Sequence, residues 1–252
     1  MSKSTGSQIA KNGFIEQEFI RDLLNGNKNI LDKIKEKLGV KLKPNLQVVP
    51  GTSKSDIKCG KINIQVKKTK QGQFGQVDRH WVDHLTANVT EIKPIEKMLK
   101  ELCELPTKKE AENGHLMCNK KEKVKKLNTN FYDQKEIDNF LKVLNENKKK
   151  IVKYAFYGIN PEDAPKLFIV SKFSNKTKRE NITIYKTRDI INEICNNEVK
   201  IRPSGTVFEI GNCFTFQRKG GDGGKVSGNQ FQFKFVPTKL TCDRYVRYKI
   251  LD

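Results

Sequence analysis

The chain has 252 residues, a length that one substantial hydrophobic core can organise, so the sequence requires no second domain. Its 49 Lys and Arg residues against 29 Asp and Glu residues give a formal net charge of +20, which indicates nucleic acid as a partner unless a Lys-rich composition alone explains it. No apolar run reaches 18 residues and no basic amphipathic or lipidated segment is evident, so the sequence excludes a membrane-spanning protein and disfavours a membrane-surface one.

Two helices and a short strand are predicted in the first fifth of the chain. Apolar residues recur at nearly helical spacing over residues 8–24 and again over 30–38, where Gly39 ends the helix. Residues 46–49 then have the composition of a strand. The N-terminus lacks the apolar core of a secretory signal, and the six cysteines form no CxxC pair. Both features are typical of a cytoplasmic protein with reduced thiols.

Residues 51–81 carry the clearest pattern in the chain. Over residues 62–67, Ile-Asn-Ile-Gln-Val-Lys, apolar side chains occupy every second position, which predicts a strand with one apolar and one polar face. Asp56 precedes this run across a short connection in which Gly60 can take a positive φ, so the two segments suit a tight hairpin. Such a hairpin would bring the Asp56 carboxylate beside Gln65 and Lys67. A polar strand face is often merely solvated, and the neighbouring acid is what favours a site here.

These side chains suit the hydrolysis of a phosphodiester, which needs a divalent cation to polarise a phosphoryl oxygen and to activate water near neutral pH. Mg²⁺ prefers oxygen ligands. Asp56 offers a charged oxygen, Gln65 a neutral carbonyl oxygen and Val66 its backbone carbonyl. Lys67 either orients the attacking water or stabilises negative charge in the transition state. We therefore predict a metal-dependent nuclease centre.

A polar loop rich in Gly, Gln and Lys is predicted over residues 68–76, with Phe74 as its aromatic residue. Phe74 is either a hydrophobic staple onto the following helix or a wedge between base steps, in which case Gln76 reaches a base edge. A helix is predicted over residues 77–88. On it, Arg79 is expected to contact phosphate and His80 to contact phosphate or to support the metal site from behind the ligands, whereas His84 is expected to be structural.

The middle of the chain is predicted to alternate helices and strands. Residues 106–126 are dense in Lys and poor in apolar residues, which is typical of a solvated insertion, with a basic flap beside DNA as the alternative. Elsewhere the pattern predicts helices over 91–105, 133–147 and 187–195, and strands over 151–157 and 166–173. The strand over 166–173 is nearly continuous in apolar residues, so we expect it to be central.

The last quarter is rich in Gly, Phe and Thr at strand spacing, which predicts a hairpin of residues 212–218 and 230–236. The Gly-rich connection does not match the phosphate loop GxxxxGK[ST], and a strand follows it where a helix is required. It is either an ordinary turn or a loop that enters the major groove, where Arg218 or Lys219 would donate to guanine O6 and N7 and Asp222 would accept from cytosine N4. We expect Gln217 to belong to the same base-reading region.

Ser55-Asp56 together with Gln65-Val66-Lys67 resembles the PD-(D/E)xK nuclease superfamily, with Ser in place of Pro and Gln in place of the second acid. Several further blocks, in the same order along nearly the whole chain, resemble the small type II restriction endonucleases that cut at GCGC. These blocks are Ala10-Lys11-Asn12-Gly13-Phe14, Lys54-Ser55-Asp56-Ile57, Asn63-Ile64-Gln65-Val66-Lys67, Phe74 to Trp81, and Gln217-Arg218-Lys219-Gly220-Gly221-Asp222.

The resemblance implies an α/β fold with a mixed central β-sheet flanked by helices and a C-terminal β-hairpin region. We expect one endonuclease domain over residues 1–252, with a catalytic core at about 8–90 plus the central strands, a basic insertion at about 106–126 and a DNA-reading region at about 199–240. Two departures from the group stand out. The connection between Asp56 and Gln65 is shorter, and Gln17 stands where an acid is expected on the first helix, which leaves its neighbours Glu16 and Glu18 as candidate helpers.

The implied activity is Mg²⁺-dependent cleavage of double-stranded DNA at GCGC after the first G, leaving 5′-phosphate and 3′-hydroxyl ends. One centre cuts one strand, so a palindrome requires a homodimer or rebinding by a monomer. The resemblance also implies a cognate DNA methyltransferase as functional partner. The alternative from another class is a non-catalytic basic DNA- or RNA-binding protein.

Overall fold

The computed structural model describes residues 6–50, 54–70, 75–103, 126–174, 178–218, 230–241 and 243–250. They fold into two compact units, each built around its own β-sheet. Unit 1 comprises residues 1–75, 156–193 and 236–252, and unit 2 comprises residues 76–155 and 194–235. The predicted limits of the catalytic core, basic insertion and DNA-reading region concern function and stay predictions.

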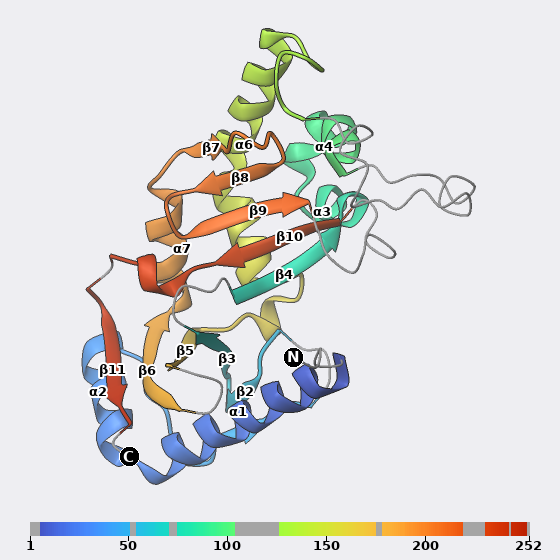
Figure 1. The fold of residues 1–252 in the computed structure, drawn as a ribbon. Coiled ribbons are helices and arrows are strands. Elements are labelled where there is room, and N and C mark those ends of the chain that lie inside the picture. Colours follow the sequence, from blue (N-terminus) through green and yellow to red (C-terminus); the bar gives the residue numbers. More distant parts are fainter. Residues whose placement is uncertain are drawn as a thin grey trace. The chain divides into compact units, whose positions relative to one another are not determined.

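Unit 1 contains a six-stranded mixed sheet in the order β1-β2-β3-β5-β6-β11 (Figure 1). The parallel pair is β3 and β5, and the other neighbours are antiparallel. Its strands are β1 (Gln47–Val48), β2 (Ile57–Cys59), β3 (Ile62–Lys70), β5 (Leu167–Phe173), β6 (Arg179–Lys186) and β11 (Tyr245–Lys249), and its other elements are α1 (Gly6–Gly26), α2 (Lys28–Leu38), the 3₁₀ turns η3 (Pro161–Asp163) and η5 (Pro237–Lys239), and most of α7 (Thr187–Cys195).

Helices α1 and α2 cover one face of this sheet. Their apolar stripes pack into a core with alternate residues of the central strands, among them Ile64, Ile169 and Ile184, none of which is exposed. Helix α2 begins where the Asn27 side chain accepts a hydrogen bond from the Ile30 amide, and it ends at Gly39 in the left-handed conformation. The predicted end of this helix at Gly39 is confirmed, because a left-handed C-cap depends on adjacent residues.

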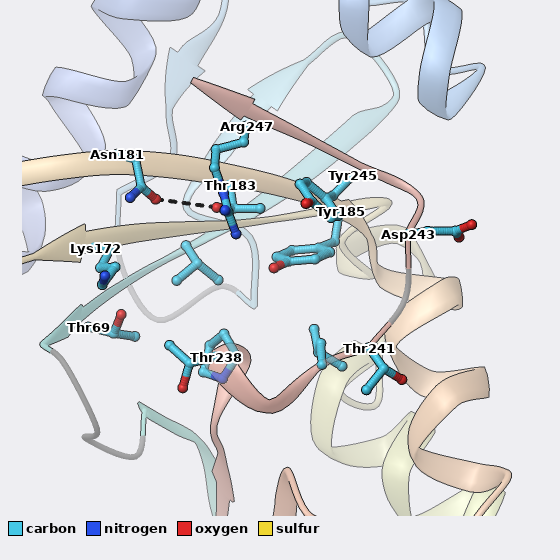
Figure 2. A pocket seen from close by; sticks show the side chains of 13 residues that line it. Thr69, Lys172, Asn181, Thr183, Tyr185, Thr238, Thr241, Asp243, Tyr245 and Arg247 are labelled. Carbon is cyan, nitrogen blue, oxygen red and sulfur yellow. Dashed lines mark hydrogen bonds between the residues drawn. The ribbon is translucent and has the colours of Figure 1, made fainter. Parts of the chain in front are cut away.

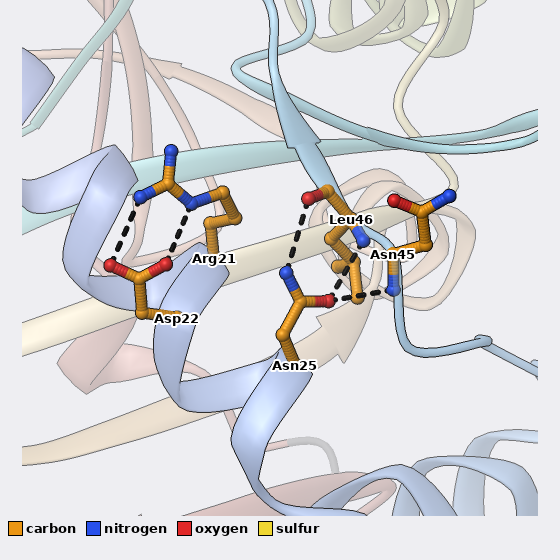
Figure 3. Close-up of polar contacts among 5 residues, drawn as sticks. All are labelled: Arg21, Asp22, Asn25, Asn45 and Leu46. Atoms are coloured by element: carbon orange, nitrogen blue, oxygen red, sulfur yellow. Dashed lines mark hydrogen bonds and ion pairs between the residues drawn. The ribbon is translucent and has the colours of Figure 1, made fainter.

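The end of α1 is tied to the chain that leads into β1. The carboxamide of Asn25 accepts from the amides of Asn45 and Leu46 at 2.9 and 2.8 Å and donates to the Leu46 carbonyl at 3.2 Å (Figure 3). Beside it, Arg21 forms two hydrogen bonds to Asp22. The three bonds of Asn25 take the place of ladder partners that this irregular segment lacks.

Side-chain alternation along β3 gives the sheet a polar face. Ile64 and Val66 point into the core beneath α1 and α2. The side chains that alternate with these two along β3 therefore lie on the opposite face, and they belong to Asn63, Gln65, Lys67 and Thr69. The prediction of a half-polar strand over residues 62–67 is confirmed, and the strand runs on to Lys70.

Unit 2 is organised by a second sheet in the order β4-β10-β9-β8-β7. Its strands are β4 (Gly75–Trp81), β7 (Val199–Ile201), β8 (Val207–Ile210), β9 (Phe214–Arg218) and β10 (Gln230–Phe235), and its helical elements include α3 (Val82–Asn88), η1 (Thr90–Ile95), α4 (Glu96–Cys103) and most of α6 (Gln134–Tyr157). Phe208 of β8 and phenylalanines at alternate positions of β9 and β10 lie in its core, where the rings of Phe208 and Phe216 stack at 4.7 Å between centroids. The predicted C-terminal hairpin is confirmed as the antiparallel pair β9 and β10.

The expected mixed α/β fold is confirmed, but two predicted elements are wrong. Residues 77–81 form a strand instead of the start of a helix, because β4 gains ladder bonds beside β10, and the helix begins only at Val82. Residues 151–157 continue α6 instead of forming a strand. Ile151, Val152 and Ala155 are buried at helical spacing, so they extend the apolar stripe of the preceding turns.

Some of the sequence lies outside this description. The predicted 106–126 insertion falls outside the described residues except for Lys126, and so does the Gly-rich connection between β9 and β10. The predicted 68–76 loop is shorter than expected, because β3 extends to Lys70 and β4 begins at Gly75. No helix of the described residues is both long and apolar enough to cross a membrane.

Candidate active site

Asp56 stands at the start of the β2–β3 hairpin and is held by both its backbone and its side chain. Its amide donates to the Ile64 carbonyl at 2.9 Å. Its carboxylate accepts from the Val66 amide at 2.6 Å through Oδ2 and from the Gln17 carboxamide at 2.7 Å through Oδ1. Each carboxylate oxygen can accept more than one bond, so both keep acceptor capacity for a ligand.

The surroundings of Asp56 have opposing effects on the pKa of its carboxyl group. Burial raises the pKa of the Asp56 carboxyl, whereas the positive charges of Lys67 and Lys54 and the hydrogen bonds from Val66 and Gln17 lower it, and burial prevails. A carboxylate that costs stability to bury, yet is flanked by two lysines, is typical of functional sites.

The side-chain oxygen of Gln65, Oε1, is a buried hydrogen-bond acceptor. The Gln65 side chain is 3% exposed, and its Oε1 finds no hydrogen-bond partner among the described residues. Gln65 follows Ile64, which pairs with Ile57 across the hairpin, while Asp56 precedes Ile57. A buried acceptor without a donor costs free energy. An oxygen left in this state beside a carboxylate suits a cation.

Val66 and Lys67 complete the group. The Val66 side chain is in the core, and its amide is the donor that orients Asp56. Lys67 lies one side-chain period beyond Gln65 on the polar face and is half-buried. Its positive charge acts on Asp56, so the strand brings a cationic group and an oxygen pair to one place.

The first helix contributes Gln17, and Glu16 is committed elsewhere. Glu16 is 4% exposed along its side chain and pairs with Arg179, whose Nη2 lies 2.8 Å from Oε2 and whose Nε lies 3.1 Å from Oε1. The same guanidinium lies 3.5 Å from the centre of the Phe19 ring. Glu16 therefore anchors α1, and its neighbour Gln17 is the residue that reaches Asp56. The role of Glu18 as a helper stays untested.

The donor set fits a hard divalent cation. It offers carboxylate and carboxamide oxygens, the ligand types that Mg²⁺ prefers. Within the described ranges no three His, Cys, Asp or Glu side chains gather to bind a metal, so any ion here relies on one acid and neutral oxygens. Such a site leaves positions open for water and for a phosphate oxygen.

The predicted DNA contacts are placed only in part. Phe74, Lys219 and Asp222 lie outside the described residues, and Gln76, Arg79, His80 and Arg218 are described by their backbones alone, in β4 and β9. Gln217 is half-buried on β9, opposite Gln232 on β10. Alternation puts it on the face away from the phenylalanine core. These residues stay predictions.

The sequence does not predict the role of Lys54 near Asp56 or that of Arg179 as the partner of Glu16. Lys54 directly precedes Ser55-Asp56 in the sequence, and its charge acts on the Asp56 carboxyl in the structure. Arg179 gives no local sequence signal, because its partner Glu16 is 163 residues away. The position of Gln17, in contrast, is indicated by the sequence, since Gln17 stands where the resemblance places an acid on the first helix.

Comparison with known proteins agrees with this geometry. A family model described as R.HinP1I restriction endonuclease matches residues 24–241, a stretch that includes Asp56, Gln65 and Lys67. Among solved structures, restriction endonuclease MspI in complex with its cognate DNA is similar in fold, with a TM-score of 0.54 and 11% sequence identity over 91% of each chain. No curated protein sequence gives a significant match.

Proposed function

This chain belongs to the R.HinP1I restriction endonuclease family and is a type II site-specific deoxyribonuclease, and we propose that it hydrolyses double-stranded DNA at GCGC after the first G with Mg²⁺ as its cofactor. A DNA duplex as substrate is supported by the fold that it shares with MspI, which was crystallised with its cognate DNA. The family favours this function over that of a non-catalytic DNA- or RNA-binding protein.

The observation that carries the proposal is the buried Oε1 of Gln65, which finds no hydrogen-bond partner in the described ranges and lies on the strand that pairs beside the anchored Asp56. We assign the metal to Asp56, Gln65 and the Val66 carbonyl. The ion, when bound, supplies positive charge at the scissile phosphate and lowers the pKa of water. The Val66 and Gln17 hydrogen bonds hold the Asp56 carboxylate in one orientation, so its oxygens need no rearrangement when the ion arrives.

Lys67 would provide positive charge near the phosphoryl oxygens that become more negative during the reaction. Attack of water on phosphorus forms a new P–O bond and adds negative charge to the phosphoryl oxygens. The P–O3′ bond then breaks, the attacking water loses a proton to solvent, and the 3′ oxygen takes a proton from water to leave as a hydroxyl. The Lys67 ammonium, on the same strand face as Gln65, would stabilise that charge. The phosphate stays on the 5′ end. Lys54 adds a second positive charge near Asp56.

Base selection is assigned to two stretches of the chain, residues 74–80 and 217–222. Phe74 would wedge between base steps and Gln76 would reach a base edge, with Arg79 and His80 on phosphates. Gln217, Arg218, Lys219 and Asp222 would read the G·C pairs from the major groove. We propose action as a monomer or a homodimer in the cytoplasm, beside a methyltransferase that protects the host's own sites.

The test is digestion of a plasmid that contains GCGC sites, with Mg²⁺ or with EDTA, followed by mapping of the ends. Asp56→Ala and Lys67→Ala are expected to abolish cleavage while keeping site-specific binding in Ca²⁺. Asp32→Ala and Lys37→Ala, on the exposed side of α2, are matched controls that should cut normally. Binding without any nicking by the unaltered protein would refute the proposal, and near-normal cleavage by either site variant would remove that residue from the centre.

A further inference from the structure

A polar pocket of about 420 Å³ opens on the sheet of unit 1, and its lining contains none of the proposed metal ligands or base-reading residues (Figure 2). Side chains of β3, β5, β6 and β11 form its floor, and its rim is formed by Pro237, Thr238, Leu240, Thr241 and Asp243. The floor residues alternate with those of the core beneath α1 and α2, so the pocket lies on the opposite face of the sheet. That is also the face on which Gln65 and Lys67 lie.

The strand register connects the pocket directly to Lys67. Lys67 pairs with Val170, Val170 with Thr183, and Thr183 with Arg247, and the last three all line the pocket. Neighbouring strands are about 4.8 Å apart, so the Arg247 backbone lies roughly 14 Å from that of Lys67 along one row of the sheet. A strand of DNA held at Lys67 can reach this distance with its adjoining nucleotides.

The lining has an unused hydroxyl. Thr69 is 4% exposed, and its Oγ1 has no hydrogen-bond partner among the described residues although it lines the pocket. Nearby, Thr183 makes a long bond of 3.4 Å to Asn181, drawn as the dashed line in Figure 2. A buried hydroxyl without a partner costs free energy that a polar ligand would recover.

The lining also has an unused cation. In the described part of the chain Arg247 has no acidic partner, and its guanidinium lies 5.1 Å from the centre of the Tyr245 ring. Lys172, the other cation of the lining, is already paired with Glu180 at 2.7 Å. Asp243 at the rim is exposed to water, which weakens its influence on the pocket. A fork of free N–H donors above hydroxyl groups is suited to a phosphate ester and its sugar.

We propose that this pocket binds the sugar-phosphate backbone of the DNA substrate, next to the scissile phosphate, with Arg247 donating to a phosphate and Thr69 to an adjacent oxygen. The inference rests on the proposed function, since it takes DNA as the ligand and Lys67 as the position of the cut. Backbone contacts carry no sequence information, so the pocket would strengthen cognate and non-cognate binding alike.

The test measures the DNA dissociation constant across a series of KCl concentrations, with Ca²⁺ in place of Mg²⁺. Arg247→Ala is expected to lower the slope of log K against log [salt] by about one on cognate and non-cognate duplexes, since one phosphate contact is lost. Arg244→Ala is the matched control, because Arg244 is an exposed arginine outside the pocket lining. Thr69→Val, nearly equal in shape, is expected to weaken binding several-fold at unchanged slope.

Equal slopes for the Arg247 and Arg244 variants would overturn the proposal. So would binding of a free deoxynucleoside monophosphate at micromolar concentration that Arg247→Ala abolishes, since the pocket would then be a nucleotide site. Circular dichroism of each variant checks that it is folded. This assay needs no cleavage. A reduced slope for Arg247→Ala in a protein that never nicks plasmid would therefore support the pocket and refute the nuclease assignment. An unchanged slope in a protein that cuts the plasmid would refute the pocket and support the nuclease assignment.

Discussion

Replacing Arg179 by alanine is expected to destabilise unit 1 by about 4 kcal/mol. The change leaves the Glu16 carboxylate, 4% exposed, without the two hydrogen bonds that neutralise it. Removing one partner of a buried ion pair costs about 3–5 kcal/mol. The lost contacts of the guanidinium with the Phe19 ring and the Ser171 hydroxyl act in the same direction.

The double variant Glu16→Leu/Arg179→Met separates the ion pair from the packing. It removes both charges and keeps apolar volume, so its stability should lie within about 1 kcal/mol of the unaltered protein. Urea unfolding followed by circular dichroism gives the free energies, and amide hydrogen exchange shows whether α1 is the element that loosens. The single tryptophan, Trp81, belongs to unit 2, whereas Glu16 and Arg179 belong to unit 1. If the losses of the single variants Glu16→Leu and Arg179→Met simply add in the double variant, the buried pair is not the cause.

Three further predictions concern the same unit. Gln17→Glu places a second carboxylate beside Asp56, so Mn²⁺ titrated without DNA and followed by electron paramagnetic resonance should bind more tightly, on the order of tenfold; unchanged affinity would separate Gln17 from the metal. Asp56→Asn in EDTA should raise the Tm at pH 8 by roughly 2–4 °C, the shift expected for about 1 kcal/mol. Burial raises the pKa of this carboxyl above its unfolded value, so the ionised form costs stability above the folded pKa and the cost disappears as pH falls through it. The gain in Tm should therefore shrink in acid, and a variant less stable than the parent at pH 8 would contradict this. Asn25→Ala removes three hydrogen bonds to Asn45 and Leu46 and should cost about 2–3 kcal/mol in urea unfolding (Figure 3), whereas a loss below about 0.5 kcal/mol would show that water replaces them.

The sequence by itself determined the features that depend on near neighbours. The alternation over residues 62–67, the turn at Gly60 and the caps of α2 are local, because strand and helix periods and left-handed turns are properties of adjacent residues. The same locality allowed Asp56, Gln65 and Lys67 to be grouped, since one hairpin and one strand carry all three.

Tertiary structure alone decided the contacts between distant segments. Gln17 reaches Asp56 across 39 residues and Arg179 reaches Glu16 across 163, and no periodicity encodes either meeting. It also decided that residues 77–81 form a strand and that residues 151–157 stay helical, because ladder bonds to a neighbouring strand and burial along an existing stripe outweigh weak local preference. The sheet joins β3 to β5 in parallel, and that long-range pairing is what sets Lys67 in one row with Arg247.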